Sequence, residues 1–146
     1  MLDEVYNARI LDLAARTPNS ERLTDADATA TRHSKLCGSK LTADIRLRND
    51  AIAEIAMEVK ACALGQAAAA VVYEQAPGAT FQEVEAARHD MHEMLKKGGD
   101  GPTGRFEELR YLAPVRDYRA RHASTLLAID ALAEAFEMAR EKVVAA

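Results

Sequence analysis

The strongest constraint on the fold is an alternation of apolar and polar residues that runs through positions 41–60 and is interrupted once. In LTADIRLR (41–48), apolar side chains occupy every second position, and threonine, aspartate and arginine stand between them. Side chains of a β-strand point to alternate faces, so the pattern predicts a strand with one buried and one polar face. Asn49-Asp50 predicts a turn, and IAEIAMEVK (52–60) repeats the alternation. Together the segments predict an antiparallel hairpin with one wet face.

Other segments carry helical periodicity or a weaker strand signal. Apolar residues recur with helical spacing over 2–16, and Pro18 predicts the end of that helix. A further strand is expected to begin within ATATRHSKL (28–36), where threonine alternates with other residues. The alanine-rich stretch after Cys62 predicts a helix, and Gly65 in its first turn indicates a close backbone approach.

Two more helices are expected in the second half of the chain. Thr80 and Glu83 match a capping box, and Gly98-Gly99 ends the helix that they open. The last helix is expected to start near Ser124, whose hydroxyl is of a type that commonly caps a helix. A helix, a short run of strands and then helices predict an α+β fold. In it, helices pack on one face of a small antiparallel sheet of about three strands.

Length and charge limit the possible functions. The 146 residues suffice for one domain with a proper core, so a single domain over 1–146 is expected. The formal net charge of −4 argues against general binding to nucleic-acid phosphates. No apolar run approaches the roughly 20 residues of a membrane span. The N-terminal residues lack the layout of a signal peptide, so a cytoplasmic protein with no membrane partner is expected.

The two cysteines stand at opposite ends of the predicted hairpin in the sequence. Cys37 lies in KLCGSKL just before the first strand, and Cys62 lies where the second strand gives way to a helix. Because the ends of an antiparallel hairpin meet, we expect the two cysteines to be neighbours. Free N–H groups and the helix dipole favour a thiolate at Cys62. Two such cysteines resemble half of a four-ligand metal site.

Four motifs then connect the chain to a known family. In chain order they are YNARILDLAARTPN (6–19), KLCGSKLTADIRL (35–47), IAEIAMEVKACALGQAAAAVV (52–72) and ARHASTLLAIDAL (120–132). With these motifs the chain resembles the U-type scaffolds of iron–sulfur cluster assembly, namely IscU, SufU and the N-terminal domain of NifU. The long stretch between Cys62 and the last helix is closest to the SufU branch.

The resemblance implies a SufE/NifU-like architecture and a set of metal ligands. Members of the family bind zinc or a nascent [2Fe–2S] cluster through three cysteines and an aspartate, and they receive sulfur from a cysteine desulfurase. Cys37 and Cys62 match the first two cysteines. Ser39 stands in place of the aspartate and Ser124 in place of the third cysteine. A neutral hydroxyl is a poor ligand for zinc or iron, so the serines could also have abolished binding.

Histidines offer further donors, and each family position has a simpler interpretation. His122, two residues before Ser124, and His33, four before Cys37, are the candidate third ligands. Alternatively, Ser124 is a helix cap, Ser39 a turn residue and the two cysteines inert thiols. His89 and His92 are expected to face solvent. Arg116, Arg119 and Arg121 form a basic cluster that is solvated, steers an acidic partner or stabilises thiolates.

Three functions follow from these alternatives. The first is an iron–sulfur cluster assembly scaffold rather than a turnover enzyme. It would hold iron, zinc or a nascent cluster, and Cys62 would accept sulfur as a persulfide. Its partners would be a cysteine desulfurase and other assembly proteins. The second is a metal-free paralogue that binds and regulates that machinery. The third, a redox protein with a reversible disulfide, ranks lowest because there is no CxxC motif.

Overall fold

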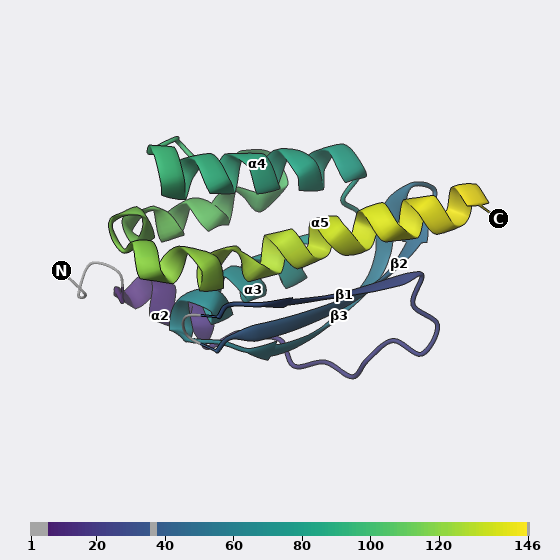
Figure 1. Ribbon diagram of the computed structural model, residues 1–146, viewed down its shortest axis with the longest axis horizontal. Helices are drawn as coiled ribbons and strands as arrows, with labels where there is room; N and C mark the ends of the chain where they lie inside the picture. The colour runs from purple at the N-terminus through teal and green to yellow at the C-terminus, as the bar shows by residue number, and fades with distance from the viewer. Residues whose placement is uncertain (1–5, 36–37, 146) are drawn as a thin grey trace.

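A three-stranded antiparallel sheet carries helices on one face (Figure 1). The computed structural model describes residues 6–35 and 38–145, with side chains as far as residue 142. α5 lies along β1 and β2, while α4 packs on α5 farther from the sheet. The predicted α+β fold is thereby confirmed. In chain order the elements are α2 (Ala8–Ala14), β1 (Ala28–His33), β2 (Lys40–Arg48), β3 (Ala51–Lys60), α3 (Ala63–Gln75), α4 (Phe81–Lys97), the 3-10 segments η1 (Gly104–Asp117) and η2 (Arg119–Arg121), and α5 (His122–Ala145).

The predicted hairpin is the pair β2–β3, and β1 adds to the other edge of β2. The register runs from Lys40 opposite Lys60 to Arg48 opposite Ala51, with one irregularity between Arg46 and Leu47. Asn49 and Asp50 make the turn with φ of 53° and 63°, in the left-handed region that Asn and Asp tolerate. The segment 28–33 is also a strand, as its threonine pattern predicts.

The start of the first described helix differs from expectation, and both ends of α4 agree with it. The first described helix begins only at Ala8, because the Asn7 side chain accepts the Ile10 N–H at 3.0 Å and caps it there. Residues 2–5 of the helix predicted over 2–16 lie outside the described part. The capping box of α4 and its left-handed C-cap at Gly98 are both confirmed. None of the helices in residues 6–35 and 38–145 is long and apolar enough to cross a membrane.

Helix α3 forms the centre of the core. Residues 67–72 are each at most 1% exposed. Its neighbours are α2 and β3 as well as α5 and η1, so all sides of the helix are covered. Alanine at four of these six positions lets the neighbouring backbones come close without leaving voids.

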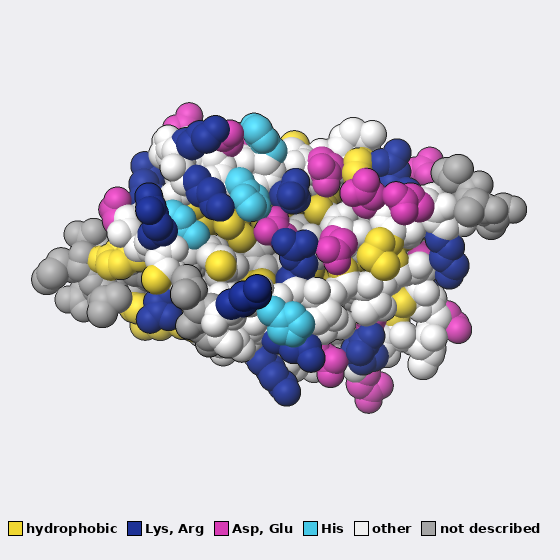
Figure 2. All heavy atoms as spheres, in the orientation of Figure 1, with side chains coloured by type: hydrophobic (Ala, Val, Ile, Leu, Met, Phe, Trp, Pro, Cys, Tyr) yellow, Lys and Arg dark blue, Asp and Glu magenta, His cyan; other side chains and the backbone are white. Residues whose placement is uncertain are grey.

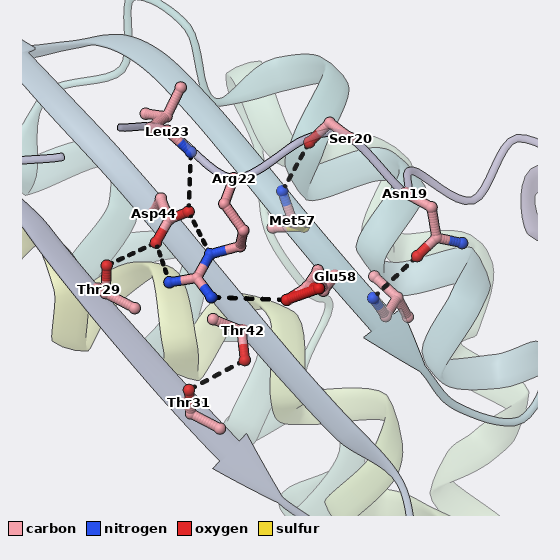
Figure 3. A network of polar contacts seen from close by, with 11 residues as sticks. Asn19, Ser20, Arg22, Leu23, Thr29, Thr31, Thr42, Asp44, Met57 and Glu58 are labelled. Carbon is pink, nitrogen blue, oxygen red and sulfur yellow. Dashed lines mark hydrogen bonds and ion pairs between the residues drawn. The ribbon is translucent and has the colours of Figure 1, made fainter. Parts of the chain in front are cut away.

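The outer face of the sheet is not wet along β2, contrary to the sequence-based prediction. Thr42 is 7% exposed and Asp44 is fully buried. The segment between α2 and β1 lies over this face, where Arg22 donates to both oxygens of Asp44 at 2.6 and 2.9 Å (Figure 3). The Leu23 N–H and the Thr29 hydroxyl donate to the same carboxylate at 3.1 and 2.5 Å. The alternation within β2 carries no trace of this cover, because the covering segment lies elsewhere in the chain.

Asp44 should make stability depend on acidic pH. Burial by itself raises the pKa of Asp44, but the hydrogen bonds from Arg22, Thr29 and the Leu23 N–H outweigh it and hold the pKa below its ordinary value. The carboxylate therefore stabilises the fold above its unfolded pKa of about 3.9, and that contribution is lost as pH falls through the lower folded pKa.

We expect Asp44→Asn to lower the free energy of unfolding at pH 7 by about 2–3 kcal/mol, because charge-assisted hydrogen bonds to a buried group are lost. Urea unfolding of both proteins between pH 7 and pH 2 measures the difference, which should shrink below about pH 4. The exposed Asp12→Asn variant is the control. An equal difference between Asp44→Asn and wild type at every pH would contradict the assigned role.

Candidate functional site

Cys62 stands at the junction of β3 and α3. It is the N-cap of α3, with φ −67° and ψ 171°, and it is a half-buried free thiol. The junction is braced by Gln66, whose side-chain amide donates to the Ala61 carbonyl at 3.0 Å. The prediction that Cys62 lies at a helix N-terminus is confirmed. Cys62 therefore stands at the positive end of the α3 dipole.

Ser124 faces Cys62 from the first turn of α5. The Cys62 Sγ and the Ser124 Oγ lie 3.6 Å apart. Ser124 is fully buried, and its hydroxyl donates to the Arg121 carbonyl at 3.1 Å. Because the hydroxyl has a single proton, the Cys62 thiol acts as donor to the Ser124 oxygen in this arrangement. Two residues 62 apart in the sequence thus form one polar contact at the edge of the core.

The structure corrects the interpretation of Ser124 as a helix cap. α5 begins at His122, directly after η2, so Ser124 is the third residue of the helix. Its hydroxyl bonds back to a carbonyl rather than to an N–H group, and Thr125 Oγ1 donates to the same Arg121 carbonyl at 2.8 Å. The 3-10 segment supplies the turn that a capping serine would otherwise provide.

Gly65 allows the two helix ends to approach. A Cβ at this position would lie 2.8 Å from the Ala61 Cβ and 3.0 Å from the Ser124 carbonyl oxygen. Both distances are shorter than ordinary packing, so the first turns of α3 and α5 touch only because position 65 has no side chain. The close backbone approach predicted at Gly65 is confirmed, and it brings the Ser124 backbone against the first turn of α3.

Ser39 and Cys37 belong to the connection between β1 and β2. Ser39 is buried, and its carbonyl accepts the Ser34 N–H at 2.8 Å. The register places Lys40 beside Lys60, so Ser39 lies at the end of the sheet from which Cys62 follows. Cys37 lies outside the described residues, and its predicted closeness to Cys62 stays a prediction. Gly38 has φ +70°, a conformation that glycine adopts without strain.

The histidines do not join the Cys62–Ser124 pair. His122 Nε2 lies 3.1 and 3.0 Å from the carbonyl oxygens of Val115 and Arg116. On an α-helix two residues span about 200°, so His122 and Ser124 occupy nearly opposite faces of α5. His33 is exposed at the end of β1.

The other two histidines lie on α4. His89 is exposed, as expected, whereas His92 is half-buried, with Nε2 2.8 Å from Asp130 Oδ1. The expectation that His92 faces solvent was therefore wrong. The covering carboxylate comes from α5 and gives no local signal in the sequence around His92.

The described donors provide a suitable geometry but a weak ligand chemistry for a metal ion. A thiolate and an oxygen bound to one tetrahedral zinc would lie about 3.5–3.8 Å apart, from bond lengths of about 2.0–2.3 Å. The distance of 3.6 Å between Cys62 and Ser124 falls within this range. Within residues 6–35 and 38–145, however, no three side chains of His, Cys, Asp or Glu gather closely enough to bind a metal.

Comparisons with known proteins agree on one family. The model of the NifU-like N terminal domain matches residues 5–144. The crystal structure of a nitrogen-fixing NifU-like protein (N-terminal) from Brucella abortus is 48% identical, with a TM-score of 0.93 over 97% of this chain and 98% of that one.

More distant relatives agree with this match. An iron–sulfur cluster assembly scaffold protein IscU of Thermotoga maritima is 23% identical over 91% of this chain and 93% of its own length. A candidate scaffold protein for the SUF system from Fervidobacterium islandicum shares the fold, with 22% identity and a TM-score of 0.82 over 92% of this chain and 98% of that one.

Replacing Gly65 should disturb both packing and the thiol. We expect Gly65→Ala to lower the free energy of unfolding by about 1–2 kcal/mol, because overpacking costs about 1–3 kcal/mol and the better helix propensity of alanine returns up to about 1. Alkylation of Cys62, measured in a Cys37→Ala background, should also become faster as Ser124 is pushed away.

The double variant Ala61→Gly/Gly65→Ala is the matched control, because it removes the 2.8 Å contact and keeps the contact with the Ser124 carbonyl. In the Ala61→Gly background, the change Gly65→Ala should therefore lower the free energy of unfolding by less than it does in wild type. Unchanged stability and unchanged alkylation in Gly65→Ala would show that the two helix ends are not held in close contact.

Proposed function

Because the chain belongs to the NifU-like N-terminal domain family, which its residues 5–144 match, we propose that it is a scaffold-like protein of iron–sulfur cluster assembly rather than a turnover enzyme. In this proposal Cys62 accepts sulfur from a cysteine desulfurase. Cys37 and Cys62 together hold iron, zinc or a nascent [2Fe–2S] cluster as cargo. The observation that carries the proposal is the half-buried Cys62 thiol at the N-terminus of α3, 3.6 Å from the Ser124 hydroxyl.

The sulfur transfer uses groups that surround Cys62. The Cys62 thiolate attacks the outer sulfur of the desulfurase persulfide and forms a new S–S bond. The S–S bond of the desulfurase breaks, and its cysteine leaves as a thiolate. One sulfur atom changes carrier and no external oxidant is needed. The α3 dipole stabilises the attacking thiolate. The Ser124 hydroxyl can turn its proton away from the Arg121 carbonyl and donate it to the sulfur, because Thr125 Oγ1 still donates to that carbonyl.

The serine at position 124 implies that the cargo is held loosely. Its oxygen lies at a suitable distance from Cys62, but a neutral hydroxyl binds zinc or iron far more weakly than a thiolate. Ser39, at the same end of the sheet, is also neutral. A weak site suits a protein that receives sulfur or metal and passes it on. We place this exchange in the cytoplasm, with the desulfurase and other assembly proteins as partners.

Sulfur transfer and metal content test the proposal directly. Wild type, Cys37→Ala and Cys62→Ala are incubated anaerobically with a cysteine desulfurase and cysteine, and the persulfide is located by mass spectrometry. Sulfur should be found on Cys62 in wild type and in Cys37→Ala, and not in Cys62→Ala. Bound iron or zinc, measured by elemental analysis, should fall in both cysteine variants.

Ser124→Ala is the control, since it removes the hydroxyl and keeps the thiol, so it should still accept sulfur. Equal metal content in wild type and both cysteine variants, together with no persulfide on Cys62, would overturn the proposal.

Restoring charged donors should strengthen metal binding. In Ser39→Asp/Ser124→Cys, a second thiolate faces Cys62 and a carboxylate joins the same end of the sheet. We expect zinc to bind about tenfold or more tightly than in wild type, because thiolate and carboxylate are favoured zinc ligands. Competition with a chromophoric chelator measures the affinity. Ser39→Asn/Ser124→Ala is the matched control, and a double donor variant that binds no better would refute the assigned geometry.

A metal-free interaction partner is the second candidate function. The Ser124 hydroxyl is already bonded to a carbonyl, and no three-ligand group occurs among the residues that the structure describes. Such a protein would bind a desulfurase or another assembly protein and modulate it. Co-purification with the desulfurase, combined with no metal in wild type and no persulfide on Cys62, would favour this candidate over the first.

A further inference from the structure

A second feature lies on the other side of the N-terminal end of α5. A cavity of ≈ 400 Å³ is bordered by the C-terminal end of α4, by η1 and η2, and by α5. Its size falls within the range of protein ligand sites, about 300–1,000 Å³. Its polar lining comes from Lys96, Arg116, Arg119 and His122, and its apolar lining includes Leu95 and Leu126. Among the described residues that line it, none carries a carboxylate. Figure 2 shows Lys and Arg gathered around hydrophobic atoms over this part of the face.

Three cations without an acidic partner line this one cavity. Lys96, Arg116 and Arg119 make no ion pair with any acid in residues 6–35 and 38–142. Arg116 only donates to the Ala113 carbonyl at 3.3 Å. Seven cations elsewhere pair with a carboxylate, namely Arg16, Arg22, Arg32, Arg46, Arg88, Lys97 and Arg105. Other exposed cations, such as Arg48 and Lys142, also lack an acidic partner within residues 6–35 and 38–142, but they do not line this cavity. In a chain with net charge −4, three cations without acidic partners around one hollow form a local field that favours anions.

His122 fixes the shape of one wall of the cavity. Its Nε2 donates to the carbonyl oxygens of Val115 and Arg116, which ties η1 to the first turn of α5. Arg116 and Arg119 are thereby carried on a segment anchored to the helix. The cavity and Ser124 lie on nearly opposite faces of α5, so an occupant of the cavity leaves the Cys62 thiol accessible.

We propose that this cavity docks a short acidic peptide segment of a partner protein, with an apolar side chain between its carboxylates. The carboxylates pair with Lys96, Arg116 and Arg119, and the apolar side chain packs on Leu95 and Leu126. The combination favours a peptide over a free inorganic anion, because an anion alone would leave the apolar lining uncovered. This inference goes beyond the proposed function and does not depend on sulfur or metal binding at Cys62.

A labelled model peptide tests the proposal on the full chain. The probe is fluorescein-labelled Asp-Leu-Asp-Leu with an amidated C-terminus, titrated with wild-type protein and followed by fluorescence anisotropy. We expect saturable binding that weakens with added salt. Arg116→Gln/Arg119→Gln should bind the peptide about tenfold or more weakly, because each lost charge pair weakens the contact. Arg116→Lys/Arg119→Lys keeps the charges and should retain most of the affinity.

The control removes the same charge far from the cavity. Arg48→Gln/Lys142→Gln changes two exposed residues, one at the end of β2 and one near the end of α5, and should bind like wild type. The uncharged peptide Asn-Leu-Asn-Leu should bind at least about tenfold more weakly than the acidic one.

Four results would each overturn the proposal. The first is that wild type shows no saturable binding, and the second is that the Arg116/Arg119 glutamine variant binds the acidic peptide no more weakly than the control variant does. The third is that the uncharged peptide binds wild type as tightly as the acidic one. The fourth is that inorganic phosphate displaces the probe at lower concentrations than the unlabelled acidic peptide does. The last result would identify a free anion as the occupant. Circular dichroism checks that each variant is folded. If the glutamine variant does not fold, the test rests on the lysine variant, which keeps the charges and should retain most of the affinity, and on the comparison of the acidic with the uncharged peptide.

Discussion

The burial of α3 is the constraint on which the rest of the structure depends. Because residues 67–72 are almost inaccessible to solvent, the sheet, α2, α5 and η1 must all pack around this one helix. Alanine provides little buried area per residue, so the helix contributes mainly by letting its neighbours approach closely. The larger side chains that fill the core, such as Phe106, Phe136 and Met91, come from the surrounding elements.

The same close packing positions the candidate site. Gly65 extends the small-residue surface of α3 to its first turn, and there it brings the Ser124 carbonyl against the helix. Cys62 then faces Ser124 because both stand where two helix ends meet. α5 separates this contact from the basic cavity: Ser124 lies toward the core, and His122 lies toward η1. One helix thus presents two chemically different surfaces within a single turn.

The outer face of the sheet shows a different way of excluding water. Helices cover one face with apolar contacts, whereas the segment after α2 covers the other with hydrogen bonds to Asp44 and to the edge strand β3 (Figure 3). Asn19 and Ser20 accept the N–H groups of Val59 and Met57 at 3.2 and 2.9 Å. An edge strand bonded in this way offers fewer free backbone groups to other chains.

The sequence by itself determined the local elements and the family. Four signals that can be read locally in the sequence agree with the structure or the comparisons. They are the alternation over 41–60, the turn at Asn49-Asp50, the capping box at Thr80 and Glu83, and the order of the four family motifs. Only the tertiary structure decided that Asp44 is buried under Arg22 and that His92 pairs with Asp130. It also decided that Ser124 lies inside a helix and contacts Cys62, and that His122 lies on the opposite side of that helix. These contacts join residues that are far apart in the chain or depend on how η2 continues into α5. Periodicity and spacing report only the conformation of a few neighbouring residues, whereas such contacts are set by the packing of whole elements around α3.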